Sequence, residues 1–487
     1  MDTKLVNIDE LQNVLSDENK TIIGIQRFMQ PFTLGTTLKH YSSIKQKGYK
    51  LTDVLIWLCV FQIMGVSIYQ ATRQILSNLK LCGEKCVYYR LMENPQINWR
   101  GLYRRIVLKY YEIVKSKGEE PIKGTIRCFI IDDTLIGKTG KLIEGVTKVF
   151  DHAKHKAVLG LKMLVLGYWD GMNFLSVDFS LHRELGKNKK GGLTKREQRL
   201  QHTKVREKDS CTAQREKELD ESKIDCAIKM LKRADKLGLP VDYVLTDSWF
   251  TCMELIDAVR TLLKGAVHFL GMVVMNRHKF EYKGKSYTTS GLIALLERKT
   301  SHYSRKFKCR YIDVIVHYQG EDFRLFLIKY GTKGNFRAVL TTNLKLNFAE
   351  MMDVYKIRWS IEVFFKECKQ YLMLGKYQSP NFDGQIASMT ITLITHTVLT
   401  LEKRFNSYQT MGELFRKTQK QLLELTLWER LNSVILELIN FLMELCEIDI
   451  DELMERILGN EQYEKQYTVM LLALKTVKQE NVLKTDV

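Results

Sequence analysis

The stretch Tyr355–Lys369 reads YKIRWSIEVFFKECK and predicts one amphipathic helix. Its chemically active side chains follow each other at spacings of 3, 4, 4 and 3: Tyr355, Arg358, Glu362, Lys366 and Lys369. At about 100° per residue they fall within an arc of roughly 80°. The opposite side carries Ile357, Ile361, Phe364 and Cys368. The apolar side can face a core, while one carboxylate among cations suits a metal-dependent enzyme that acts on a polyanion.

The composition of the chain agrees with a polyanionic partner. The chain has 487 residues, enough for two to four domains, and a net charge of +19. Such an excess of positive charge attracts polyanions, of which nucleic acid is the commonest, although it also fits a plain basic soluble protein. Residues 424–464 are the exception, with 11 acidic and 2 basic residues.

The sequence predicts a cytoplasmic protein. Acidic residues near the start interrupt any signal-like apolar run, and the ten cysteines are scattered as expected in a reducing compartment. The apolar run 54–68 is too short to span a bilayer with ease, so we expect a buried core helix there and no membrane partner.

A change of pattern near residue 125 predicts an α/β core. Short strands are expected at Thr125–Ile131, Ala157–Tyr168, Asn173–Leu181, Val241–Thr246 and Val267–Val274. Helices are expected at 218–236 and 251–264, and the basic segment 187–206 reads as a mobile, solvated loop. Residues 277–345 are mostly strand-like and form a β-rich insertion before the helix that carries Glu362.

Three acids occupy distinctive places in this order of elements. Asp133 follows the first strand, Asp247 follows the fourth, and Glu362 lies on the helix after the insertion. Carboxylates at strand ends can converge on the crevice where open α/β sheets carry their sites. Three of them suit two Mg²⁺ or Mn²⁺ ions, which prefer oxygen ligands and support phosphoryl transfer. Asp132 competes with Asp133 for the first position.

The pattern Tyr355-x2-Arg358-x3-Glu362-x6-Lys369 resembles the Tyr-Arg-Glu-Lys signature of insertion-sequence DDE transposases of the "IS-four" type. Asp133–Thr134 resembles the first catalytic Asp of that family, and LTDSWF around Asp247 resembles the second. The resemblance covers about residues 125–400. It implies an RNase H-like catalytic core interrupted by a β-rich insertion, with helical N- and C-terminal regions.

The resemblance also implies roles for individual residues. Asp133, Asp247 and Glu362 would be catalytic and hold two metal ions. DNA would be bound by Tyr355, Arg358, Trp359, Lys366 and Lys369. The implied reaction is cut-and-paste transposition, in which the same site cleaves the transposon's terminal inverted repeats and joins them to target DNA. The implied setting is a prokaryotic, nucleoid-associated protein.

The expected domains follow from these patterns. They are a helical DNA-binding region at 1–122, the core at 123–276 and 346–405, the insertion at 277–345, and an acidic helical region at 406–487. Within the last region, Val434–Cys446 could form either a core helix or a dimerisation helix, and bringing two DNA ends together needs at least two protomers.

Two other functions remain open at this point. One is an inactive or domesticated protein that occupies the repeats without cutting them. The other is a related nuclease that cuts DNA without strand transfer.

Overall fold

The computed structural model describes Met29, Phe32, Leu38 and residues 48–75, 82–118, 124–151, 154–186, 191–331, 334–406, 408 and 410–420. Contacts divide the chain into two units. The first comprises residues 1–36, 45–89 and 412–487, and the second comprises 37–44 and 90–411. The expected helix at Val434–Cys446 lies outside the described residues. No helix in the described part of the chain is long and apolar enough to cross a membrane.

The first unit is built around α4 (Leu51–Met64), whose residues 54–64 are all buried. This confirms the expected core helix. Gly65 ends α4 in the left-handed conformation, at φ 70°, which favours glycine. Phe61 of α4 packs edge-on against Tyr88 of α6 (Lys85–Met92), and Gln419 donates to the Ile63 carbonyl oxygen at 3.3 Å. The unit therefore combines segments from both ends of the chain.

The second unit is organised around a mixed sheet. Its core strands are β1 (Cys128–Gly137), β3 (Lys156–Trp169), β4 (Phe174–His182), β5 (Tyr243–Thr246) and β6 (His268–Val273). They lie in the order β4-β3-β1-β5-β6, with β3 antiparallel to its neighbours and β5 and β6 parallel to β1. A short β2 (Thr147–Asp151) pairs with the start of β3. The expected α/β fold class is confirmed.

The β-rich insertion continues this sheet. Its strands are β7 (Lys279–Tyr282), β8 (Lys285–Thr288), β9 (His302–Ser304), β10 (Cys309–Tyr318), β11 (Glu321–Tyr330) and β12 (Phe336–Thr341). Because β12 pairs antiparallel with β6, the insertion joins the core sheet edge to edge. The strand pattern missed one helix, α12 (Thr289–Thr300), which begins at the Thr288 cap.

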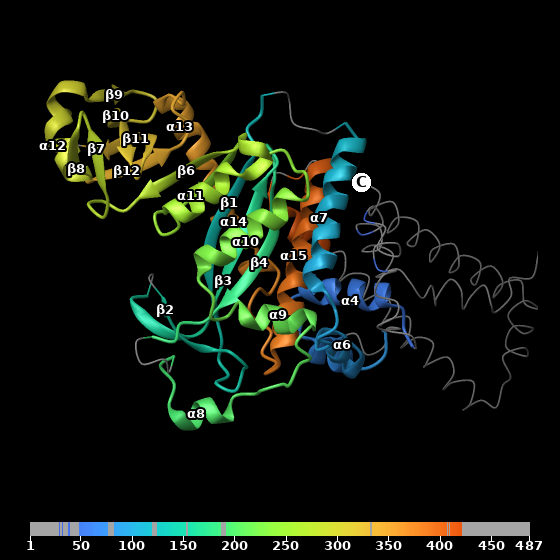
Figure 1. Ribbon diagram of the computed structural model, residues 1–487. Helices are drawn as coiled ribbons and strands as arrows, with labels where there is room; N and C mark the ends of the chain where they lie inside the picture. Colours follow the sequence, from blue (N-terminus) through green and yellow to red (C-terminus); the bar gives the residue numbers. More distant parts are fainter. Residues whose placement is uncertain are drawn as a thin grey trace, which may run out of the picture. The chain divides into compact units, whose positions relative to one another are not determined.

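Helices cover both faces of the core strands. On one face lie α14 (Trp359–Tyr371) and α15 (Phe382–Phe405), and α7 (Trp99–Ser116) runs beside α15 (Figure 1). On the other face α10 (Lys223–Asp235) packs with α11 (Met253–Arg260). Within the second unit, α7 packs on β4 and α15.

Three local expectations need correction. The first strand does not stop at Ile131, since β1 continues through both aspartates to Gly137. The Tyr355–Lys369 helix is divided into the end of α13 (Phe348–Tyr355), a 3-10 turn at Lys356–Arg358 and α14. The basic segment is not a solvated loop over 191–206, where α8 (Lys195–Leu200) forms and the Arg206 side chain is only 1% exposed.

Candidate active site

The alternation of β1 decides which aspartate faces which helix. Thr134 accepts a hydrogen bond from Lys369 of α14 at 2.6 Å, and Ile136 packs next to Gly375, just after α14. Asp132 is an alternate residue of β1 with Thr134 and Ile136, so it lies on the same face of the strand, and it contacts Arg358. Asp133 lies on the other face of β1 and forms an ion pair with Lys223 at the start of α10. Side chains on a strand alternate between its faces, so Asp132 lies on the α14 face and Asp133 on the α10 face.

Asp132 and Asp247 come together at the edge where β1 and β5 separate. The last parallel pair is Ile131 with Thr246, and each aspartate is the next residue of its chain. Burial and the nearby charge of Asp247 raise the pKa of Asp132 to about 7. Burial also raises the pKa of Asp247, although the Trp249 and Phe250 amides donate to its Oδ1. Two carboxylates in a desolvated place repel each other, and a cation relieves that repulsion.

Arg358 joins this pair of aspartates to Glu362. Its guanidinium donates to Glu362 Oε1 at 2.6 Å and lies 3.3 Å from Asp132 Oδ2. The Arg358 side chain is 16% exposed, so it is largely out of solvent. Burial opposes the charge of Arg358, but Tyr355, Glu362 and Asp132 more than compensate and raise its pKa. Arg358 therefore lies between the carboxylates of Asp132 and Glu362.

The opposite side of β1 carries a second charged group. Lys223 forms an ion pair with Asp133, and its ammonium lies 4.4 Å from the ring centroid of Trp249. Trp249 is 51% exposed and packs edge-on against Phe250. Neither Lys223 nor Trp249 was given a role from the sequence. The LTDSWF segment signals only Trp249, because the approach of Lys223 depends on tertiary structure.

The other predicted side chains are distributed around the carboxylates. Tyr355 donates to the Thr246 carbonyl oxygen at 3.0 Å, and burial raises its pKa to about 12, so it remains a neutral phenol. Lys369 is held by Thr134. Trp359 is 61% exposed, and Lys366 is also exposed. The structure thus brings Tyr355, Arg358 and Glu362 to the Asp132–Asp247 edge and leaves Trp359 and Lys366 on the solvent side of α14.

The donor set fits a hard divalent cation only in part. Asp132, Asp247 and Glu362 offer carboxylate oxygens, the ligands that Mg²⁺ and Mn²⁺ prefer. Burial and Asp247 raise the pKa of Asp132, and burial and Asp133 raise the pKa of Asp247, so both aspartates of β1 lie near Asp247. However, the described residues contain no group of three His, Cys, Asp or Glu side chains close enough to hold one ion. Arg358 instead forms ion pairs with both Asp132 and Glu362.

Part of the chain is similar to a known protein family. Residues 83–271 match the family model described as DDE superfamily endonuclease. The match supports a DDE-type enzyme of the nuclease and transposase class, which acts on DNA and generally uses divalent metal ions. It agrees with an RNase H-like reading of the mixed sheet. The matched span contains Asp132, Asp133 and Asp247 and ends before Glu362. No curated protein matches the chain significantly.

Proposed function

We propose that this protein is a DNA transposase that performs cut-and-paste transposition, with Asp132, Asp247 and Glu362 as the ligands of one or two Mg²⁺ or Mn²⁺ ions. The observation that carries the proposal is the meeting of Asp132 and Asp247 at the β1–β5 edge, beside the Arg358–Glu362 pair. The Tyr-Arg-Glu-Lys spacing supports the transposase reading within the broader nuclease class.

Asp132 replaces Asp133 in the proposed ligand set. The motif Asp133–Thr134 favours Asp133, whereas the alternation of β1 favours Asp132, which shares a face with Thr134 and the α14 residues. Asp133 is engaged by Lys223 on the other face. We give more weight to the geometry, because a metal ligand must lie on the same side of the strand as its partners.

The proposed reaction consists of in-line displacements at phosphorus. In the first, a water oxygen attacks the phosphodiester at the transposon end, the bond from phosphorus to O3′ breaks, and the water's proton finally resides on the freed 3′-OH. In the second, that 3′-OH attacks the opposite strand of the transposon end, which forms a hairpin and releases the flanking DNA, and a water then opens the hairpin and regenerates the 3′-OH. In the last, the 3′-OH attacks a phosphodiester of the target, forming one phosphorus–oxygen bond and breaking one. Bound divalent ions lower the pKa of the attacking oxygen and stabilise the leaving one. The number of phosphodiester bonds is kept in the second and last steps, so no external energy source is needed.

The cationic residues would position the DNA. Lys366 and Lys369 can contact phosphates, and Trp359 is exposed enough to pack on the DNA. Arg358 pairs with Asp132 and Glu362 here. A divalent ion held by Asp132 and Glu362 would supply the positive charge that Arg358 supplies here, and Arg358 could then hold a phosphate. The helical first unit is a candidate for binding the inverted repeats, and a dimer would hold both ends.

The test compares two neighbouring aspartates. The wild type, Asp132→Asn and Asp133→Asn are incubated with labelled duplexes taken from the DNA that flanks the gene, with Mg²⁺, Mn²⁺ or EDTA. We expect metal-dependent nicking and joined products from the wild type, and loss of nicking by at least about 10³-fold in Asp132→Asn, as for the removal of a key electrostatic group. Asp133→Asn should retain most of the activity.

Each other outcome selects an alternative. Inactivity of Asp133→Asn together with an active Asp132→Asn would restore Asp133 as the first ligand. Nicking without joined product would indicate a nuclease without strand transfer. Binding of the duplex without any nicking would indicate a protein that occupies the repeats and does not cut.

A further inference from the structure

Residues 138–151, 154–156 and 191–206 form a projecting part of the second unit, which we call the basic lobe. In Figure 1 it extends from β2 to α8, away from the core strands. It contains ten Lys or Arg and three Asp or Glu. Seven of the cations are exposed, and one of them, Lys141, is paired with Glu197. The other six are Lys148, Lys154, Lys156, Lys195, Arg196 and Arg199. A surface of this composition attracts a polyanion.

Two of the three acids of the lobe are paired with cations other than these six. Glu144 is buried and bonded to Arg206, and Glu197 is bonded to Lys141 at 2.5 Å. The third acid, Asp151, accepts a hydrogen bond from the Lys154 amide at 3.2 Å and lies opposite Lys156 in the β2–β3 ladder. Within the described residues, no ion pair involves Lys195, Arg196 or Arg199. The positive surface is therefore left to an external partner.

Backbone hydrogen bonds join the two segments of the lobe, 138–156 and 191–206. The amide of Lys148 donates to the Gly191 carbonyl oxygen at 2.8 Å, and the amide of His202 donates to the Leu142 carbonyl oxygen at 2.8 Å. Gly191 adopts φ 57° directly against Thr147, where a Cβ would lie 2.4 Å from the Thr147 methyl carbon. A capping box between Thr194 and Glu197 begins α8. These contacts hold the two segments in one arrangement.

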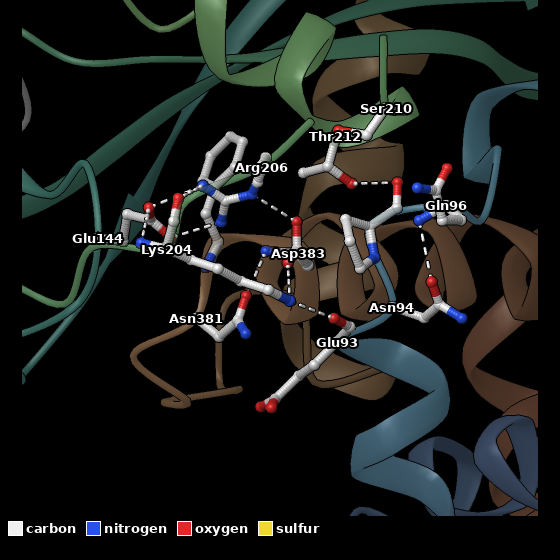
Figure 2. A network of polar contacts seen from close by, with 12 residues as sticks. Glu93, Asn94, Gln96, Glu144, Lys204, Arg206, Ser210, Thr212, Asn381 and Asp383 are labelled. Carbon is white, nitrogen blue, oxygen red and sulfur yellow. Dashed lines mark hydrogen bonds and ion pairs between the residues drawn. The ribbon is translucent and has the colours of Figure 1, made fainter. Parts of the chain in front are cut away.

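A buried ionic network fixes the lobe to the core (Figure 2). Arg206 bonds to Glu144 and to Asp383, the latter at 2.8 Å, and Lys204 bonds to Asp383 at 2.7 Å. Asp383 belongs to the first turn of α15 and is 0% exposed. Ions this deep are tolerated only when their partners are in place. A loop that served only solubility would gain nothing from such anchoring.

Position relates the lobe to the proposed catalytic edge. β1 carries Asp132 and runs directly into the lobe at Lys138, and Lys369 of α14 donates to Thr134 of the same strand at 2.6 Å. A duplex whose phosphate is held at Lys369 can therefore extend along the lobe. A fixed surface also avoids the ordering cost that a flexible basic tail would meet on binding.

We infer that the basic lobe is a preformed binding surface for the phosphate backbone of double-stranded DNA, read without regard to sequence, beside the catalytic edge. This inference rests on the proposed function for its relation to cleavage, but not for binding itself. Phosphate contacts position a duplex and carry no sequence information, which suits a surface made of lysine and arginine.

The experiment measures the salt dependence of binding to a fluorescent duplex of arbitrary sequence by the full-length protein. The variant K195A/R196A/R199A keeps the Thr194–Glu197 cap and removes three exposed cations. Since each phosphate contact contributes about 0.9 to the slope of log K against log salt, we expect the slope to become shallower by up to about 2.7. The variant K148A/K154A/K156A should act in the same direction from the other segment of the lobe.

The control is K217A/K232A/K236A, which removes three exposed lysines outside the lobe and should leave the slope within about 0.5 of the wild type. Unchanged slopes in both lobe variants, with melting temperatures that show intact folding, would overturn the inference, as would a wild type that does not bind the duplex. A wild type that binds with the expected slope but never nicks with Mg²⁺ or Mn²⁺ would instead overturn the proposed function and leave the lobe assignment standing.

Discussion

Two of the buried groups of charged side chains in the second unit, one around Arg206 and one around Arg358, are balanced differently. Around Arg206 the two most buried acids, Glu144 and Asp383, are met by Arg206 and Lys204 at hydrogen-bond distance (Figure 2). Around Arg358 the acids are in excess, because its one guanidinium contacts both Asp132 and Glu362, and Asp247 beside them accepts hydrogen bonds from the Trp249 and Phe250 amides.

The pKa directions express this difference. Burial alone would raise the pKa of Glu144, but its bonds to Arg206 and the Phe382 amide lower it, so the carboxylate stays charged. The pKa of Asp132 is instead raised to about 7 by burial and by Asp247. A satisfied network stabilises one arrangement of the chain, whereas an unsatisfied group of acids retains the capacity to bind a cation.

The largest effect should follow from removing a charge from the unsatisfied group. Glu362→Gln is expected to reduce DNA cleavage at least about 10³-fold, equivalent to roughly 4 kcal/mol of activation free energy, because the amide is a weaker metal ligand. DNA binding should remain near the wild-type value, since Glu362 does not contact phosphate in the proposed site. Single-turnover cleavage and equilibrium binding of the same duplex measure the two quantities.

Glu297→Gln provides the matched control, because Glu297 makes only a 3.9 Å contact with Lys329. Its cleavage rate should be unchanged. If Glu362→Gln cleaves DNA at the wild-type rate, Glu362 is not a metal ligand. The excess of acids around Arg358 would then not indicate a cation site.

Removing a charge from the balanced network around Arg206 should lower the free energy of unfolding. Arg206→Met leaves Glu144 and Asp383 buried without their guanidinium, and breaking such a pair from one side costs about 3–5 kcal/mol. Urea unfolding followed by circular dichroism measures the loss. If the comparison is right, Asp132→Asn should lose little stability in the same assay, since it removes a repulsion.

Arg183→Met is the control for Arg206→Met. Arg183 pairs with Asp220 at the surface, with side chains 28% and 49% exposed, and such pairs contribute about 0–1 kcal/mol. Equal losses for the two arginines would mean that the buried network adds no more than a surface ion pair.

The sequence predicted one side of the site better than the other. The period of Tyr355–Lys369 placed Arg358 and Glu362 on one face, and their 2.6 Å contact follows from an i, i+4 spacing. Motif and geometry diverged at Asp132 and Asp133, because the apolar run before them is buried on both faces and gives no alternation to follow. Only the contacts of Thr134 and Ile136 with the α14 side reveal the parity.

The prediction that the basic segment 187–206 is a solvated loop was wrong for a related physical reason. A run of lysines and arginines has the same sequence pattern whether it is solvated or paired, and the partners of Arg206, Glu144 and Asp383, are far from it in the sequence. The β-rich insertion was recognised because alternation is a local signal. Its union with the core sheet, through β12 and β6, is a long-range pairing that no local signal contains.

The smallest expected effect concerns Lys138, a buried cation that has no carboxylate partner. Its ammonium donates to the Gly375 and Tyr377 carbonyl oxygens and to Gln385 Oε1 at 3.1, 2.7 and 2.6 Å. Burial lowers the pKa of Lys138 from 10.5 to about 7. The unfolded chain therefore binds more protons than the folded one between about pH 7 and 10.5, so stability should rise with pH across this window.

We expect the free energy of unfolding to rise by roughly 1–3 kcal/mol between pH 7 and pH 9.5, and this rise should be absent in Lys138→Met. Urea unfolding of both proteins at the two pH values measures the difference. Parallel profiles would mean that three carbonyl oxygens neutralise a buried ammonium as well as the carboxylates do for Arg206, and that the balance of formal charge is not what separates the two groups.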